Sequence, residues 1–137
     1  AGFTDNAQSY GLTPTSDPAT VANDNSVYFA LPRTATTLSI CSNDGAGAPT
    51  CTNLPEMAVV SGALFEAHLS AAPNAASIEY WIRERTSGRV RSGSITGAEL
   101  PTSTAFMRVC FFSQGNGLNA PNASFSTSWI NGYVSIP

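Results

Sequence analysis

The sequence has little charge and no lysine. Asp, Glu, Lys and Arg make up 11% of its 137 residues, against about 25% in average soluble domains, and all six cations are arginine. The net charge is −3, so no basic field exists that would attract phosphate, and nucleic-acid binding is not expected. No apolar run approaches the length of a membrane span, which argues against membrane insertion.

Cysteine and histidine are also scarce, with three cysteines and one histidine in the chain. Cys41 and Cys51 flank a loop rich in Gly, Asp and Pro, and they could form a disulfide across a hairpin. The alternative is that all three cysteines stay reduced in a protein assembled in a reducing cytoplasm. Cys110 lies in an apolar segment and is expected to be a buried thiol.

His68, the only histidine, lies two residues from Glu66, so the two would share one face of a strand. Such a pair could bind a metal or transfer protons, but a metal site needs three or four converging ligands, and no motif supplies the others. We therefore predict a solvated strand face, with no metal and no cofactor. No G-x-S-x-G motif is present for a nucleophilic serine, so no catalytic residue is assigned.

A pair of carboxylates for glycoside hydrolysis is conceivable, because the chain contains several glutamates. The candidates are Glu66, Glu79, Glu84 and Glu99. Their spacing along the chain does not bring any two of them to the separation that hydrolysis requires. We therefore predict that the protein is not an enzyme.

The residues that are abundant are typical of an all-β protein displayed outside a cell or on a virus particle. Hydrophobic residues make up 42% of the chain, and Ser, Thr, Asn, Ala and Gly replace charged residues on its expected surface. Short segments of alternating apolar and polar residues recur between turn signals, which predicts an antiparallel β-sandwich of about eight strands. The predicted strand segments are residues 26–31, 37–42, 50–54, 57–60, 62–71, 77–96, 105–113 and 124–136.

Some of these boundaries depend on single residues. The strand 50–54 is predicted to stop at Pro55, which cannot donate a ladder hydrogen bond. Residues 62–71 are rich in good helix formers, but their alternation favours a strand. Residues 1–25 are polar and are predicted to be an extended arm, followed by a β-sandwich domain of residues 26–137.

Residues 77–96 form the central segment, predicted as a hairpin with a two-residue turn at Ser87-Gly88, since glycine tolerates the positive φ of tight hairpin turns. This turn would place Glu84 opposite Arg91 as a pair at the rim. Alternation then divides the other side chains between two faces. The face predicted to point inward carries Ile78, Tyr80, Ile82, Glu84, Arg91 and Ile95, and the opposite face carries Glu79, Trp81, Arg83, Arg85 and Val90.

Trp81, Arg83 and Arg85 on the second face are the predicted ligand-binding residues. An exposed Trp offers a flat apolar platform for a sugar ring, and Arg offers forked donors for hydroxyls or carboxylates. The alternative is that Trp81 packs beneath a neighbouring strand or subunit while the arginines stay solvated.

Four segments, SVYFALP, SIEYWIRERTSG, GSITGAELPT and AFMRVCFF, together carry a resemblance to a known family. With them the chain, from about residue 25 onward, resembles the concanavalin A-like, laminin-G-type lectin domains of bacteriophage virion proteins, such as tail-fibre components. The E-x-D-x-x-E motif of the glucanase branch and the metal loop of legume lectins are not recognisable here. Their absence argues against hydrolysis and against a calcium-dependent sugar site.

The resemblance implies a non-enzymatic protein on the surface of a bacteriophage virion, assembled in the host cytoplasm. We expect part of a tail fibre or spike that attaches to host-surface glycan. The alternative is a head decoration or cement protein that stabilises the capsid, and a glycan hydrolase comes third. The expected partners are other virion proteins and copies of the chain itself, as a homo-oligomer such as a trimer.

Overall fold

The structure, a computed structural model, describes residues 2–4, 25–32, 34–72, 75–97, 100–101 and 108–110. Within these ranges the chain is all-β and its paired strands are antiparallel, which confirms the predicted class. The strands are β1 (Gly2–Thr4), β2 (Asn25–Ala30), β3 (Thr37–Asp44), β4 (Thr50–Ala58), β5 (Phe65–Ser70), β6 (Ser77–Glu84), β7 (Val90–Thr96) and β8 (Arg108–Cys110). None of the described residues forms a helix long and apolar enough to cross a membrane.

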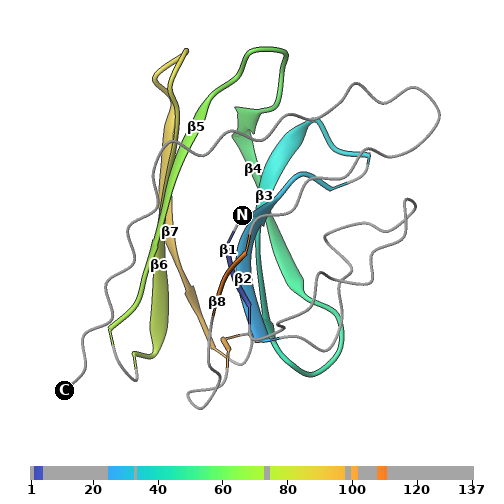
Figure 1. The fold of residues 1–137 in the computed structure, drawn as a ribbon, viewed down its shortest axis with the longest axis vertical. Coiled ribbons are helices and arrows are strands. Elements are labelled where there is room, and N and C mark those ends of the chain that lie inside the picture. Colours follow the sequence, from blue (N-terminus) through green and yellow to red (C-terminus); the bar gives the residue numbers. More distant parts are fainter. Residues whose placement is uncertain are drawn as a thin grey trace.

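Two sheets face each other around one core (Figure 1). The larger sheet has the strand order β4-β3-β2-β1-β8, and the smaller sheet has the order β5-β6-β7. The core consists of the buried residues Val27, Phe29, Ile40, Leu54, Met57, Tyr80 and Ile82. The Phe29 ring of β2 meets the Tyr80 ring of β6 edge-on, with ring centroids 6.2 Å apart, and so joins the two sheets. This two-layer packing is compatible with the predicted β-sandwich.

Alternation along each strand determines which side chains reach the core. In β2, Val27 and Phe29 point inward, and Phe29 lies opposite Ile40 of β3. Residues 62–71, which are rich in helix formers but were predicted to form a strand, contain β5, so the strand prediction is confirmed. Phe65 and Leu69 of β5 pack against the core, and the intervening polar residues face the other way.

Strand β4 does not stop at Pro55, so that predicted boundary is wrong. The pairing of β3 with β4 shifts register between Thr37 and Ser39, which marks a bulge in β4 around the proline. A bulge on an edge strand tolerates a residue without an N–H, because the ladder is already interrupted there. The irregularity also lets Leu54 and Met57, three residues apart, both reach the core with no exposed surface.

The β6–β7 hairpin has the predicted faces but not the predicted turn. Ile82, rather than Glu84, lies opposite Arg91, so both the two-residue turn and the Glu84–Arg91 pair are wrong. The wider turn closes when the N–H of Gly88, which has a φ of 74°, donates to the carbonyl of Glu84 at 2.9 Å. The register slips by two residues, and because side chains alternate with a period of two, each stays on its predicted face.

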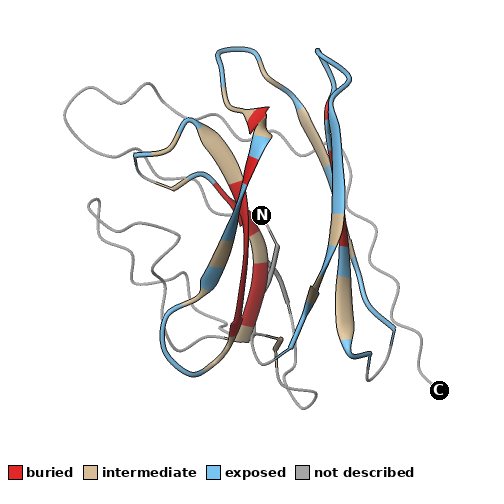
Figure 2. Ribbon diagram, turned by 180° about the vertical axis from the view of Figure 1, so that it is seen from behind, coloured by how far each residue is buried: buried red, intermediate tan, exposed pale blue. Residues whose placement is uncertain are grey.

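The larger sheet is buried on both of its sides along β3 (Figure 2). Ile40 and Ser42 face the shared core, whereas Cys41 and Asn43 face away from it, and all four are buried. In β6 of the smaller sheet the inward residues are buried, but the residues between them are half-buried or exposed. The smaller sheet therefore leaves one side accessible.

A disulfide joins Cys41 of β3 to Cys51 of β4, which lie directly opposite each other in the register. Their Cα atoms are 4.1 Å apart, so the bond closes a hairpin whose strands are already paired by hydrogen bonds. Both cysteines lie on the side of the larger sheet that faces away from the shared core.

Several predictions concern residues outside those that the structure describes. Gly2–Thr4 of the predicted arm forms β1, between β2 and β8, but residues 5–24 lie outside the described ranges. The division into an arm of residues 1–25 and a domain of residues 26–137 therefore stays a prediction. The predicted strand 124–136 also lies outside them, and so does most of 105–113 apart from β8. The buried thiol at Cys110 stays a prediction as well.

Candidate functional site

The candidate site is the side of the smaller sheet that faces away from the core, which we call the Trp81 face. It consists of Glu66 and His68 from β5, Glu79, Trp81 and Arg83 from β6, and Val90, Ser92 and Ser94 from β7. These residues share one side because each is a cross-strand partner, or a neighbour two positions along, of another member. The inward positions of β6 carry apolar residues that anchor the strand in the core, so alternation turns Trp81 outward.

Trp81 lies between an aromatic ring on one strand and a short side chain on the other. The imidazole of His68 on β5 meets the indole edge-on, with ring centroids 5.2 Å apart and an angle of 62° between the planes. On the other flank, Trp81 lies opposite Ser92 of β7, and Ser94 follows on the same side of that strand. Both serines are short and exposed, so the surface that borders the indole on this flank is polar and does not project above it.

Glu66 contacts both a histidine and an arginine at this face. Its Oε1 lies 3.5 Å from Nε2 of His68, and its Oε2 lies 3.8 Å from Nη1 of Arg85. The exposed side-chain fractions are 41% for Glu66, 65% for His68 and 63% for Arg85, so these contacts add little to stability. Arg83 is directly opposite Glu66 in the register but takes part in none of the ion pairs of the described residues.

The structure therefore places Trp81 and Arg83 together on one accessible face, with Arg85 beside them at the start of the β6–β7 turn. The sequence pattern predicted Glu66 and His68 only as a separate pair on a solvated strand face, and their place beside Trp81 was not predicted. The available signal was the spacing of two residues in both strands, between Glu66 and His68 in β5 and between Trp81 and Arg83 in β6. Which residues of β5 and β6 lie opposite each other also depends on the register of the hairpin. Alternation within each strand does not determine that register.

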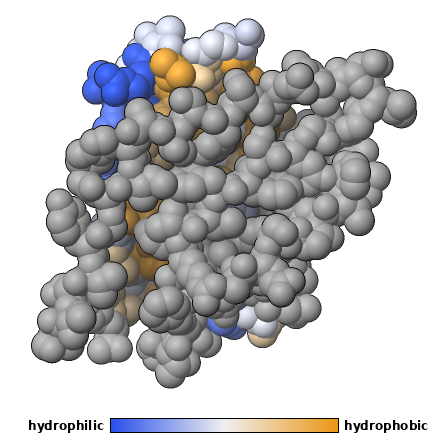
Figure 3. Space-filling model, in the orientation of Figure 1, coloured by the Kyte–Doolittle hydropathy of each residue, from blue (hydrophilic) through white to orange (hydrophobic). Residues whose placement is uncertain are grey.

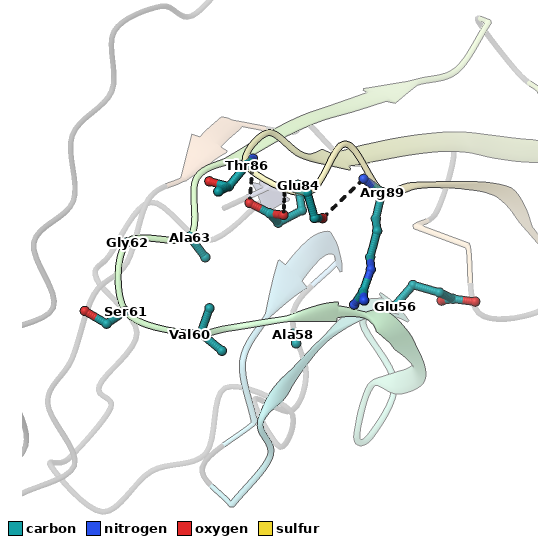
Figure 4. Close-up of a pocket in the computed structure, with 10 residues that line it drawn as sticks. Glu56, Ala58, Val60, Ser61, Gly62, Ala63, Glu84, Thr86 and Arg89 are labelled. Carbon is teal, nitrogen blue, oxygen red and sulfur yellow. Dashed lines mark hydrogen bonds between the residues drawn. The ribbon is translucent and has the colours of Figure 1, made fainter.

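A second candidate is a pocket of about 310 Å³ at the end of the sandwich, between the β4–β5 and β6–β7 turns (Figure 4). Ala58 and residues 60–63 line one side of it, and Glu84, Ser87 and Arg89 line the other. Glu56 also lines the pocket. Its Oε1 lies 3.8 Å from Nη1 of Arg91, while its buried Oε2 has no hydrogen-bond partner among the described residues. Figure 4 shows the Arg89 side chain extending from the turn toward Glu56 and β4.

Glu84 uses both of its carboxylate oxygens to hold the β6–β7 turn. Oε1 accepts the N–H of Thr86 at 2.8 Å, and Oε2 accepts the N–H of Ser87 at 2.6 Å. Hydrogen bonds from the Ser87 side chain first, and then from the two backbone amides, outweigh desolvation and lower the pKa of Glu84 to about 2. Glu84 is thus an ionised anchor of the turn and is poorly suited to donate a proton near neutral pH.

The surface at this end of the molecule is both polar and apolar. At the top of Figure 3, where Figure 1 places the β4–β5 and β6–β7 turns, strongly hydrophilic side chains lie next to hydrophobic ones. The exposed apolar residues of this end include Val60 and Leu64, and Val90 begins β7. The pocket is therefore bordered by apolar surface and by the arginines of the turn.

The glutamates considered for hydrolysis are not brought together in the described residues. Glu84 lies on the inward side of β6, whereas Glu66 and Glu79 lie on the Trp81 face. Glu79 pairs with Ser70, four positions along β5 from Glu66, so the two are about 13 Å apart by strand rise, beyond the usual range for a hydrolytic pair. Glu99 lies outside the described residues.

Within the described ranges, no three His, Cys, Asp or Glu residues are grouped so that they could hold a metal ion. A scan against protein-family models and searches of curated proteins and solved structures found no match to this chain.

Proposed function

We propose that this chain is a non-enzymatic surface protein of a bacteriophage virion, whose Trp81 face attaches the particle to host-surface glycan as part of a tail fibre or spike. The low charge, the absence of lysine and the segments that resemble lectin-like virion domains support this assignment. The two antiparallel sheets around a common core also support a finer assignment of the fold as a concanavalin A-like jelly-roll sandwich.

The observation that carries the proposal is the outward-facing, half-buried indole of Trp81, bordered by His68 on one side and by the short Ser92 on the other. One face of a sugar ring is made of C–H groups, which pack well on an aromatic plane. The sugar hydroxyls then need donors and acceptors at the edge of that plane, and imidazole, serine and guanidinium groups supply both. A shallow face of this kind suits the end or the side of a glycan chain.

The Cys41–Cys51 disulfide fits a protein that functions outside the cytoplasm. Disulfides are rare in a reducing cytosol and common in proteins exposed to an oxidising medium, including virion surfaces. In a released particle the bond would hold the β3–β4 hairpin closed without any cellular reductant acting on it.

The test is direct binding of the purified chain to polysaccharide extracted from the host envelope, followed by isothermal titration calorimetry with the glycans that bind. We expect Trp81→Ala to weaken binding at least about tenfold, which corresponds to about 1.4 kcal/mol. Leu31→Ala is a matched control, because it also truncates a partly exposed apolar residue but lies beside β2 in the larger sheet. Unchanged binding in Trp81→Ala, with the fold intact by circular dichroism, would reject this face as the glycan site.

A second candidate function, head decoration, is favoured by the exposed apolar residues at the end of the sandwich. Val60 and Leu64 are 66% and 63% exposed, and apolar side chains grouped on a surface often mark contacts with other subunits. Counting and locating the chain on purified particles separates the two roles. Copies in the hundreds on the capsid indicate decoration, whereas a few to some tens at the tail indicate attachment.

A further inference from the structure

We infer that the Trp81 face selects acidic sugars, such as uronic or sialic acids, because Arg83 forms no ion pair with the other described residues and can bind their carboxylate. This inference rests on the proposed function, since it names the class of glycan that the same face binds. The inference depends on which arginine the carboxylate of Glu66 contacts, and not on the number of charged residues on the face.

The first step concerns Glu66, the residue directly opposite Arg83. An acid and an arginine at such a position would ordinarily pair with each other. Glu66 instead contacts His68 with one oxygen and Arg85 with the other, at 3.5 and 3.8 Å. Glu66 is therefore directed at His68 and Arg85 rather than at Arg83, and Arg83 has no ion-pair partner among the described residues.

The second step concerns position. Arg83 and Trp81 are two residues apart on the same side of β6, so their Cα atoms are about 6.6 Å apart by strand rise. A sugar stacked on the indole can thus direct a ring carboxylate toward the guanidinium. Arginine suits this role because its planar fork presents two parallel N–H donors to a carboxylate.

The third step concerns the overall field. The chain carries a net charge of −3, so long-range attraction does not favour an anionic glycan. Discrimination must then come from a short-range contact with a cation that no described acid neutralises. Arg83 supplies that contact beside Trp81, whereas Arg85 is already paired and Arg91 pairs with Glu56 across the two sheets.

The experiment compares matched acidic and neutral probes by titration calorimetry on the full chain. The pairs are trigalacturonic acid with its methyl ester, and sialyllactose with lactose. We expect at least one acidic probe to bind about tenfold or more tightly than its neutral partner, since a hydrogen bond to a charged group contributes about that factor or more. Arg83→Met should weaken binding of the acidic probe about tenfold more than binding of the neutral one, which brings the two affinities together.

Arg89→Met is the matched control, because Arg89 also lacks an ion pair among the described residues but lies in the turn by the end pocket. It should change neither affinity. Equal binding of acidic and neutral probes, or equal loss of both in Arg83→Met, would overturn the selection of acidic sugars while glycan binding itself stands. If the wild-type chain binds none of the four probes and no host polysaccharide, the proposed function fails, and the inference fails with it.

Discussion

In the larger sheet, the neighbours Ile40 and Cys41 of β3 point to opposite sides, and both are buried. In the smaller sheet, the neighbours Tyr80 and Trp81 of β6 also point to opposite sides, but only Tyr80 is buried. Both sheets are antiparallel and both contribute to one core. The difference lies in what happens on the side away from that core.

This difference separates residues that stabilise the fold from residues that are available for the proposed recognition. A sheet covered on both sides loses stability when either side is altered, because every side chain there packs against others. An antiparallel sheet with one side in water can change that side at little cost in stability. The smaller sheet can therefore carry Trp81, Arg83 and His68 as a binding face without weakening the fold.

The largest expected effect is on the free energy of unfolding, when leucine is replaced by alanine at a buried position and at an exposed one. Leu54→Ala removes a fully buried side chain from β4 of the larger sheet, and we expect it to lower the free energy of unfolding by about 3 kcal/mol because a cavity remains. Leu64→Ala, at a residue 63% exposed just before β5, should change it by less than about 0.5 kcal/mol. Urea denaturation measures both values, and similar losses in the two variants would contradict the comparison.

The next effect tests the two sides of the smaller sheet against each other. A Cβ at Gly93 of β7 would lie 2.6–2.9 Å from three atoms of the Tyr80 phenol, which is packed in the core. We expect Gly93→Ala to cost about 2 kcal/mol of unfolding free energy through overpacking. Ser92→Ala, the adjacent residue on the Trp81 face, should have almost no effect, and a large loss there would mean that this face is not free.

The smallest effect concerns the acid dependence of the β6–β7 turn. The lowered pKa of Glu84, about 2, means that its contribution to stability is present above the unfolded-state pKa near 4.5 and is lost as pH falls toward 2. Glu84→Gln should therefore have a lower Tm than wild type at pH 7, and the difference should shrink between pH 4.5 and 2. Thermal denaturation across this range measures it.

Ser87→Ala tests the cause of that pKa, because the Ser87 side chain makes the largest contribution to its lowering. The titration midpoint of Glu84, followed by NMR of its carboxyl carbon, should rise from about 2 in this variant. A midpoint that does not move would mean that the backbone amides alone hold the carboxylate.

Parts of the fold were predictable because they depend on local pattern. The alternation in residues 77–96 correctly separated the inward Tyr80 and Ile82 from the outward Trp81 and Arg83. The register was wrong by two residues, because a shift of two leaves the alternation unchanged and the pattern cannot detect it. Pro55 was misjudged for a related reason, since a bulge depends on the partner strand and leaves no signal of its own.

The sequence by itself determined the all-β class, the faces of the central hairpin and the outward position of Trp81, because a two-residue period acts within each strand. Only the tertiary structure placed Glu66 and His68 beside Trp81, left Arg83 without an ion pair to any described residue and turned Glu84 into an anchor of its own turn. These outcomes depend on register and on packing between segments distant in the chain. Both are set by how the connections close and how the two sheets meet, which local residue patterns do not encode.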